Sequence, residues 1–251
     1  MEKVLECRDL TFTYPSGKVV FKDVNLVTCR GELVGIVGPT GTGKSTLVRC
    51  IAHLIPPTGG HVYLEGAEVT RPSPKIALIH QSIATFPWMT AVDNVKLSLR
   101  GERLPEAEAT GMAEKMLDLV GLGESKGLYP KEMSGGMRQK LTIARALVAS
   151  PLVLLLDEPF VYLDEISAES LRKEIYALIF NPESTLKSAV LVSHNLREVV
   201  ELSDRIYILK GAPAMIVEDI KVDLPRPRNE RTPGFLEYLD RLHAALTVKR
   251  E

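Results

Sequence analysis

Residues 32–46 read ELVGIVGPTGTGKST, an apolar run followed at once by a glycine-rich turn. The run from Glu32 to Val37 is apolar at nearly every position, which is typical of a strand buried on both faces of a parallel sheet. After the turn, the pattern from Leu47 to Ala52 predicts a helix, and Pro56 and Pro57 end it. The stretch therefore predicts a strand, a turn and a helix in direct succession.

The turn itself, Gly38–Ser45, fits G-x-x-x-x-G-K-[ST]. Its glycines let successive backbone N–H groups surround phosphate oxygens at a helix N-terminus, which already favours anions. Lys44 can then reach the β- and γ-phosphates, and the Ser45 hydroxyl can ligate Mg²⁺. A chance glycine-rich turn is the alternative, but the flanking strand and helix favour a phosphate site. The candidate nucleotide-binding residues here are Gly38, Thr40, Gly41, Thr42, Gly43, Lys44, Ser45 and Thr46.

Further apolar runs of strand length occur at 76–79, 153–156 and 189–192, each followed by a polar residue and a loop or helical pattern. Repetition of strand and helix predicts an α/β fold, with a parallel sheet covered by helices. Residues 4–14 instead alternate between polar and apolar, and the turn 15–17 separates them from a second such run. That pattern predicts an antiparallel strand pair.

Between residues 83 and 149 the patterns are helical, and no comparable strand occurs. In the helix expected at 107–120, one face carries Met112, Met116, Leu119 and Val120. We therefore expect a helical insertion at 83–149 in a sheet domain formed by 1–82 and 150–228.

The segment 224–228, Leu-Pro-Arg-Pro-Arg, cannot be regular helix or central strand. Beyond it, at 229–251, apolar residues fall at helical spacing. We expect an amphipathic C-terminal helix there, docked on the core of this chain rather than on a partner.

Composition narrows the class of protein. The 251 residues are 45% apolar and 25% charged, which excludes a disordered chain. The net charge of −1 gives no support to a nucleic-acid partner held by bulk electrostatics. Three cysteines without a CxxC pair predict reduced thiols. With no apolar run near the ~20 residues of a membrane span and no signal peptide, we expect a cytoplasmic protein that serves a membrane only through a partner.

A pair of carboxylates follows the run at 153–156. Asp157 stands at the end of a buried strand, on the sheet edge where ligands bind in open α/β folds, and is placed to hold Mg²⁺. Glu158 is next in line and can act as general base toward water. An apolar strand ending in Asp-Glu is by itself more often plain surface, but downstream of a phosphate loop the carboxylates favour catalysis.

Gln81 and His194 follow two other predicted strands, so we expect them on the same sheet edge as Lys44 and Asp157. Alone, either residue would be structural; here they are interpreted as contacts to the γ-phosphate and to water. Tyr14 could offer its ring to a purine face, although a strand tyrosine packed on the sheet is the common alternative.

The tripeptide Ser134-Gly135-Gly136 precedes a helix that we expect to run from Lys140 to Ala149. Ser134 stands 23 residues before Asp157. Such a turn is another anion-binding terminus. In isolation it would be a helix N-cap with flexible glycines.

This set of motifs resembles the ATPase subunits of ATP-binding-cassette (ABC) transporters, over nearly the whole chain, as one ABC ATPase domain. The resemblance implies a P-loop NTPase (RecA-like) core with an N-terminal antiparallel β subdomain and an inserted α-helical subdomain. It makes Tyr14 the aromatic loop, Gln81 the glutamine loop, Ser134–Gly136 the signature, Leu163-Asp164 the D-loop and His194 the switch histidine. The tracts FPWMTAVDNV (86–95), SGGMRQ (134–139), DEPF (157–160) and DLPRPR (223–228) are similar to the nitrate, sulfonate and taurine importer class.

The resemblance also implies that each chain holds half of each reaction centre. Two copies would close head to tail over two ATP molecules, Ser134, Gly135 and Gly136 of one copy capping the ATP of the other, with Asp164 also at the nucleotide. The implied metal ligands are Ser45, Gln81 and Asp157, and the implied catalytic residues are Glu158, His194 and Gln81. Further implied partners are membrane permease subunits and, indirectly, a solute-binding protein, which places the chain on the inner face of the cell membrane.

The sequence departs from the family pattern at His80, Met133, Val161, Tyr162 and Asn195, none of them a phosphate or metal ligand. The bulky Tyr162 could matter, because the D-loop of the family runs along the facing subunit.

A cytosolic ATPase of the same fold, acting on DNA or in iron–sulfur cluster assembly, is the alternative function. A P-loop kinase or GTPase would need neither the Ser-Gly-Gly turn nor the switch histidine. The transported solute is left open.

Overall fold

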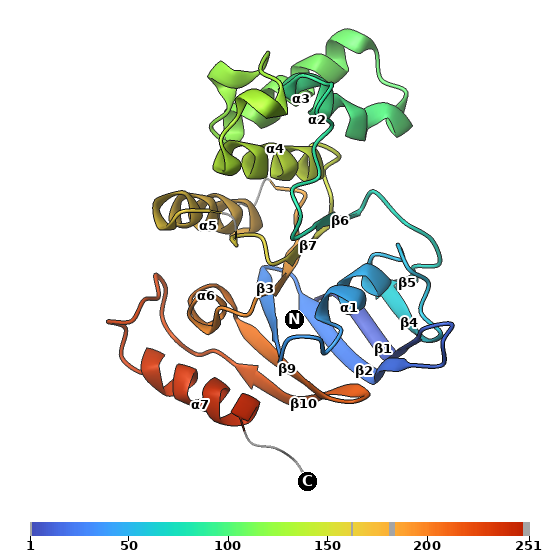
Figure 1. The fold of residues 1–251 in the computed structure, drawn as a ribbon, viewed down its shortest axis with the longest axis vertical. Coiled ribbons are helices and arrows are strands. Elements are labelled where there is room, and N and C mark those ends of the chain that lie inside the picture. The colour runs from blue at the N-terminus through green and yellow to red at the C-terminus, as the bar shows by residue number, and fades with distance from the viewer. Residues whose placement is uncertain (1, 162, 181–183, 248–251) are drawn as a thin grey trace.

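A twisted sheet of ten strands runs through the computed structural model, which describes residues 2–161, 163–180 and 184–247 (Figure 1). Tyr162 lies outside these residues. The strands are β1 (Lys3–Thr13), β2 (Val19–Cys29), β3 (Glu32–Val37), β4 (Gly59–Leu64), β5 (Ala67–Glu68), β6 (Ile76–Ile79), β7 (Val153–Asp157), β8 (Ser188–Val192), β9 (Arg205–Gly211) and β10 (Ala214–Lys221). The α-helices are α1 (Lys44–Ile51), α2 (Ala91–Lys96), α3 (Glu106–Leu119), α4 (Gly135–Leu147), α5 (Glu165–Phe180), α6 (Leu196–Leu202) and α7 (Phe235–Thr247).

One half of the sheet is parallel. In the order β9-β3-β8-β7-β6 every neighbouring pair is parallel, with Gly35 opposite Leu191 and Leu155 opposite Val190. All residues of β3, β7 and β8 are buried, as the nearly continuous apolar runs predicted. The carboxyl ends of these strands therefore meet at one edge of the sheet.

The other half is antiparallel. β1 pairs with both β2 and β4, and β5 closes the edge beyond β4, so the predicted N-terminal strand pair is confirmed. The hairpin β9–β10 joins the two halves, because β10 pairs with β2 through Ala214 and Phe21. The antiparallel strands thus continue the parallel ones in a single sheet.

The helices α2 to α4 lie together at one end of the molecule, beyond β6 and β7 (Figure 1). No strand occurs between 83 and 149, as predicted. The predicted face of α3 was wrong at Leu119, which is 51% exposed. The buried stripe is formed by Ala109, Ala113 and Leu117, whose neighbours Met112 and Met116 pack at its margin. At about 100° per residue, Leu119 lies about 120° around the helix from Ala113.

The helix with the Ser-Gly-Gly turn begins five residues earlier than predicted, at Gly135, because Ser134 caps it. At the C-terminus, α7 packs on α6 and β9 with Phe235, Leu239 and Leu242 buried, which confirms docking on the chain's own core. Within the described ranges, no helix combines the length and the apolar character needed to cross a membrane.

Candidate nucleotide-binding site

The phosphate loop joins β3 to α1 and requires its glycines for geometric reasons. Gly41 and Gly43 have φ of +82° and +90°, which side chains disfavour. A Cβ on Gly43 would stand 2.3 Å from Cγ1 of Val20, and one on Gly38 would stand 2.2 Å from the carbonyl oxygen of Leu209. The loop therefore fits against β2 and β9 only with glycine at these positions.

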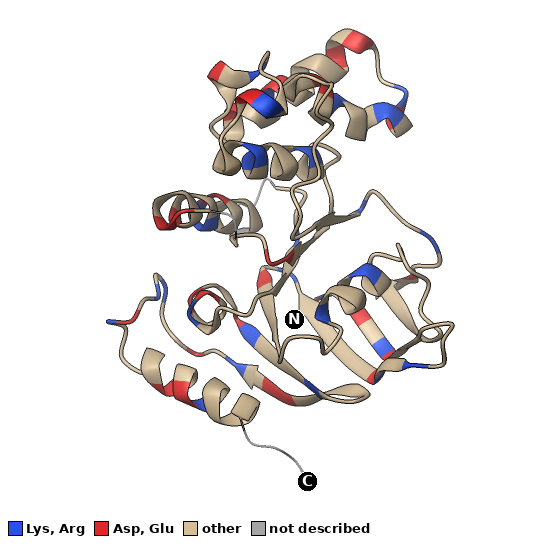
Figure 2. Cartoon of the chain, viewed as in Figure 1, with Lys and Arg blue, Asp and Glu red and all other residues tan. Residues whose placement is uncertain are grey.

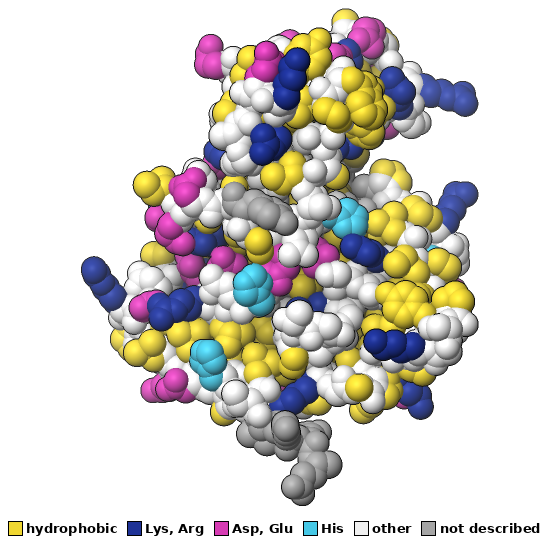
Figure 3. Space-filling view, in the orientation of Figure 1, with side chains coloured by type: hydrophobic (Ala, Val, Ile, Leu, Met, Phe, Trp, Pro, Cys, Tyr) yellow, Lys and Arg dark blue, Asp and Glu magenta, His cyan; other side chains and the backbone are white. Residues whose placement is uncertain are grey.

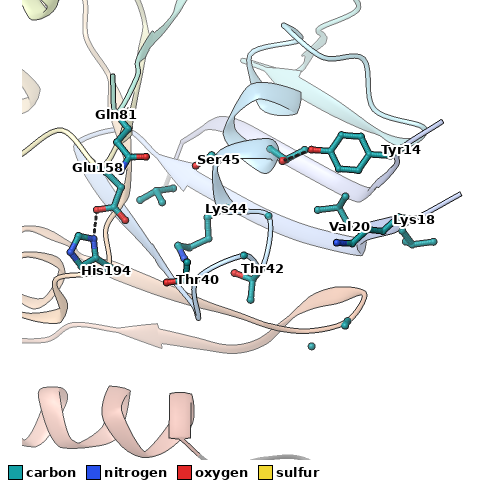
Figure 4. Close-up of a pocket in the computed structure, with 17 residues that line it drawn as sticks. Tyr14, Lys18, Val20, Thr40, Thr42, Lys44, Ser45, Gln81, Glu158 and His194 are labelled. Carbon is teal, nitrogen blue, oxygen red and sulfur yellow. Dashed lines mark hydrogen bonds and ion pairs between the residues drawn. The ribbon is translucent and has the colours of Figure 1, made fainter. Parts of the chain in front are cut away.

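Lys44 is buried at the start of α1 and folds back over the loop. Its Nζ donates to the carbonyl oxygens of Gly38 at 2.7 Å and Pro39 at 3.0 Å. Burial lowers the pKa of Lys44, while the charges of Glu158 and Asp157 act in the opposite direction. Figure 4 shows its ammonium group among the loop residues, within reach of an anion held by the loop.

Two oxygen-bearing side chains meet where α1 begins and β7 ends. The Ser45 hydroxyl donates to Oδ1 of Asp157 at 2.9 Å, and Asp157 is 1% exposed. Among the described residues no cluster of three or more His, Cys, Asp or Glu could hold a metal. The hydroxyl–carboxylate pair fits Mg²⁺, which prefers oxygen ligands and takes few from the protein because water and phosphate complete its shell.

Glu158 and His194 are in direct contact across the carboxyl ends of β7 and β8. Nδ1 of His194 lies 2.7 Å from Oε2 of Glu158, and the Glu158 N–H donates to the Val192 carbonyl at 2.9 Å. Glu158 has φ +52°, a conformation that turns its side chain out of the strand direction. Gln81 lies beside Glu158 in Figure 4, so three predicted catalytic side chains gather at one place.

A cavity of about 540 Å³ unites these groups. The predicted site residues that line it are Tyr14, Thr40, Gly41, Thr42, Gly43, Lys44, Ser45, Thr46, Gln81, Glu158 and His194. Gly38 and Asp157 are not among the lining residues, but each is hydrogen-bonded to one of them, Gly38 to Lys44 and Asp157 to Ser45.

Sequence reasoning missed part of the cavity wall: Lys18, Val19, Val20, Val192, Gly211 and Ala212. They come from the start of β2, the end of β8 and the β9–β10 turn. The position of residues 18–20, directly after the predicted turn at 15–17, could have indicated that these three line the cavity. The other three residues had no such signal.

Four predicted nucleotide contacts lie outside the cavity: Ser134, Gly135, Gly136 and Asp164. Ser134 caps α4, its hydroxyl accepting from the Met137 N–H at 3.2 Å. Asp164 accepts from the N–H and the hydroxyl of Ser167 at 3.0 and 2.7 Å, and these bonds lower its pKa. In the single chain both residues serve as helix caps.

The strand, loop and helix, with carboxylates at neighbouring strand ends, define a P-loop nucleotide-binding protein. Residues 21–161 match the ABC transporter family. The chain is 35% identical to the nitrate import ATP-binding protein NrtD of Synechocystis sp., over 96% of this chain and 94% of that protein. It is 37% identical to the aliphatic sulfonates import ATP-binding protein SsuB 2 of Burkholderia cenocepacia, over 90% and 81%.

A solved structure agrees: the dimeric, post-hydrolysis ATP-binding cassette MJ0796 bound to ADP and Pi has a TM-score of 0.77 and 29% identity, covering 87% of this chain and 98% of that one. The chain belongs to the ABC transporter family. It is an ATP-binding subunit of an ABC transporter and hydrolyses ATP. Its similarity to import ATP-binding proteins favours transport over the alternative of a non-transport ATPase.

Proposed function

We propose that this chain powers uptake of a small anionic solute through separate membrane permease subunits, by closing with a second copy over two MgATP molecules. The solute class is supported by the names of its relatives, which import nitrate and aliphatic sulfonates. The single observation that carries the catalytic part is the gathering of Lys44, Glu158 and His194 in one cavity.

In this proposal the loop Gly38–Thr46, including the side chain of Lys44, holds the phosphates of ATP, and Tyr14 stacks on the base. Ser45, Asp157 and Gln81 hold Mg²⁺, which when bound supplies positive charge at the phosphate oxygens. Glu158 accepts the proton of the attacking water, and Gln81 helps to align that water. His194, held against Glu158, donates to the γ-phosphate.

Ser134, Gly135, Gly136 and Asp164 act in this proposal on the ATP bound by the facing copy. Their absence from the lining of their own chain's cavity is the observation that supports a head-to-tail dimer. We keep the division into a nucleotide-binding core (1–82 and 150–228), a helical signature part (83–149) and a C-terminal segment (229–251) as part of the proposal.

The segment from Phe86 to Asn94 is our candidate contact with the permease. Buried Asn94 fixes it, accepting from the Phe86 N–H at 2.8 Å and donating to the Phe86 and Met89 carbonyls at 3.1 and 3.0 Å. Trp88, 69% exposed, packs edge-on against Phe86 at 5.6 Å between ring centroids. Hydrophobic side chains are visible at this helical end of the molecule in Figure 3. A fixed loop that exposes a tryptophan suits a protein partner.

Co-expression with permease subunits tests the proposal. The chain should co-purify with a hydrophobic permease on the inner face of the membrane and, with a solute-binding protein present, release phosphate in response to the imported anion. Trp88→Ala should weaken that association, whereas Leu119→Ala, which removes another exposed apolar side chain, should not. Co-purification with soluble scaffold proteins and no permease would contradict transport.

A further inference from the structure

Ser193 directly precedes His194 in the chain, and its hydroxyl is engaged both as a donor and as an acceptor. It is 1% exposed, follows the last residue of β8 and precedes His194. Its Oγ donates to Oε2 of Glu198 at 2.9 Å and accepts from the Asn195 N–H at 3.0 Å. With donor and acceptor both engaged, the hydroxyl fixes the backbone on either side of His194.

Glu198 connects this loop to α5. It stands on α6 with a side chain 13% exposed, and burial raises its pKa, while Ser193 and the positive charge of Arg172 oppose that rise. Nη1 of Arg172 lies 3.8 Å from Oε1 of Glu198. One carboxylate thus contacts the hydroxyl behind His194 with one oxygen and faces a buried guanidinium with the other.

Arg172 also reaches the other side of the catalytic pair. Its guanidinium lies 5.8 Å from the ring centroid of Phe160, which is two residues after Glu158. In Figure 2 the ribbons of α5 and α6 are both coloured at acidic and at basic residues. The segment that follows Glu158 therefore packs against Arg172 of α5, and Ser193, which precedes His194, is connected to the same arginine through Glu198.

We propose that Glu198 is a positioning residue for ATP hydrolysis. Through Ser193 it holds His194 in place against Glu158, and Arg172 anchors both Glu198 and the segment that follows Glu158. This inference rests on the roles proposed above for His194 and Glu158. Because a displacement of about 1 Å can cost up to a hundredfold in rate, loss of the link should slow turnover without preventing ATP from binding.

Glu198→Ala is the test, and its fold should survive. Arg172 keeps Glu165, which accepts from Nη2 at 2.6 Å, and Glu201, whose Oε2 lies 3.8 Å from Nε, so no buried charge is left alone. We expect kcat to fall about tenfold with KM for ATP within about twofold. Glu198→Gln keeps an oxygen acceptor for Ser193 and should restore most of kcat.

Glu201→Ala is the matched control. Glu201 lies one turn further along α6 and faces the same arginine, but among the described residues the Ser193 hydroxyl bonds to Glu198 and the Asn195 N–H and not to Glu201. We expect kcat close to wild type for this variant. An equal fall in kcat for Glu201→Ala and Glu198→Ala would overturn the inference, since it would assign the effect to the surroundings of Arg172.

A second measurement reads His194 directly. The ¹H–¹⁵N spectrum of the imidazole rings, with His194 assigned from His194→Ala, should show its resonances shifted in Glu198→Ala and unchanged in Glu201→Ala. Wild-type kcat and unshifted His194 resonances in Glu198→Ala would show that Glu198 does not position His194, and the inference would fail. If His194→Ala itself turned over at the wild-type rate, the proposed role of His194 would fail instead, and the resonances would still report on the link.

Discussion

The phosphate loop at the strand ends and the turn at Ser134 both place glycines at the start of a helix, and they differ in what surrounds them. At the loop Gly38–Ser45, Lys44, Ser45 and Glu158 line one cavity of about 540 Å³, and Asp157 is hydrogen-bonded to Ser45. The Ser134 turn also opens a helix with glycines, but its hydroxyl is bonded to its own helix and it lines no part of that cavity.

The difference teaches that a glycine-rich helix start is only half of a phosphate site. What completes the first turn is the set of strands that bring carboxylates and a histidine to it. For the second turn, the described part of this chain offers no such set. The predictions that follow ask whether a second copy supplies it.

Glu158→Gln should have the largest effect. The amide cannot accept the proton of water, so we expect turnover to fall by about a thousandfold while ATP affinity is kept. With hydrolysis blocked, the two copies should remain closed, and size-exclusion chromatography with ATP should show a dimer. Wild-type phosphate release from this variant would remove Glu158 from the role of general base.

Ser134→Arg should break the second turn alone. We expect ATP binding to the single chain to be unchanged and turnover to fall about a hundredfold, because the serine hydroxyl is lost and the long arginine side chain keeps the facing triphosphate away from the turn. Phosphate release and equilibrium binding of a fluorescent ATP analogue measure the two effects separately.

Mixing this variant with Lys44→Ala sharpens the comparison. Each variant is inactive in one half of the site, but a mixed head-to-tail dimer joins one intact loop to one intact turn. By random pairing about a quarter of the sites are restored, so activity should reappear on mixing. If it does not, at concentrations where wild type is active, the two turns do not share a site.

The same comparison explains what sequence could predict. Strands β3, β6, β7 and β8 were predicted to within one residue at either end, because each is a short apolar run that stops at a polar residue or, for β3, at the phosphate loop. Lys44, Glu158 and His194 followed from the rule that parallel strands end at one sheet edge. Local pattern and one topological rule were sufficient for this half.

Sequence failed where a residue has its role through packing with a distant partner. Val20 and Gly211 line the cavity because β10 pairs with β2. That pairing is one parallel contact, between Ala214 and Phe21, and no local sequence pattern predicts it. Leu119 was placed on the wrong face of α3 because two of the three residues in the buried stripe are alanines, which carry little apolar signal. Neither feature is visible without the neighbouring element.

Lys44→Ala should weaken nucleotide binding itself. The ammonium group now donates to the Gly38 and Pro39 carbonyls, and a triphosphate offers it charged acceptors instead. A hydrogen bond to a charged group contributes about 1.5–3 kcal/mol, so affinity should fall about tenfold to hundredfold. Calorimetry with ATP and with inorganic tripolyphosphate should show the same loss for both. Unchanged affinity would contradict the role of the loop as a phosphate cradle.

Tyr14→Ala should have the smallest effect and decides between stacking and packing. Tyr14 lines the cavity and is 42% exposed, but its ring also meets Phe12 edge-on at 5.0 Å. If the ring stacks on the base, affinity for ATP should fall about fivefold, since one aromatic contact contributes about 1 kcal/mol, while tripolyphosphate binds as before. Tyr14→Phe keeps the ring and should bind both as wild type does. A lower melting temperature in Tyr14→Ala with unchanged ATP affinity would make Tyr14 a packing residue, and the base would then lie against the Lys18–Val20 wall of the cavity.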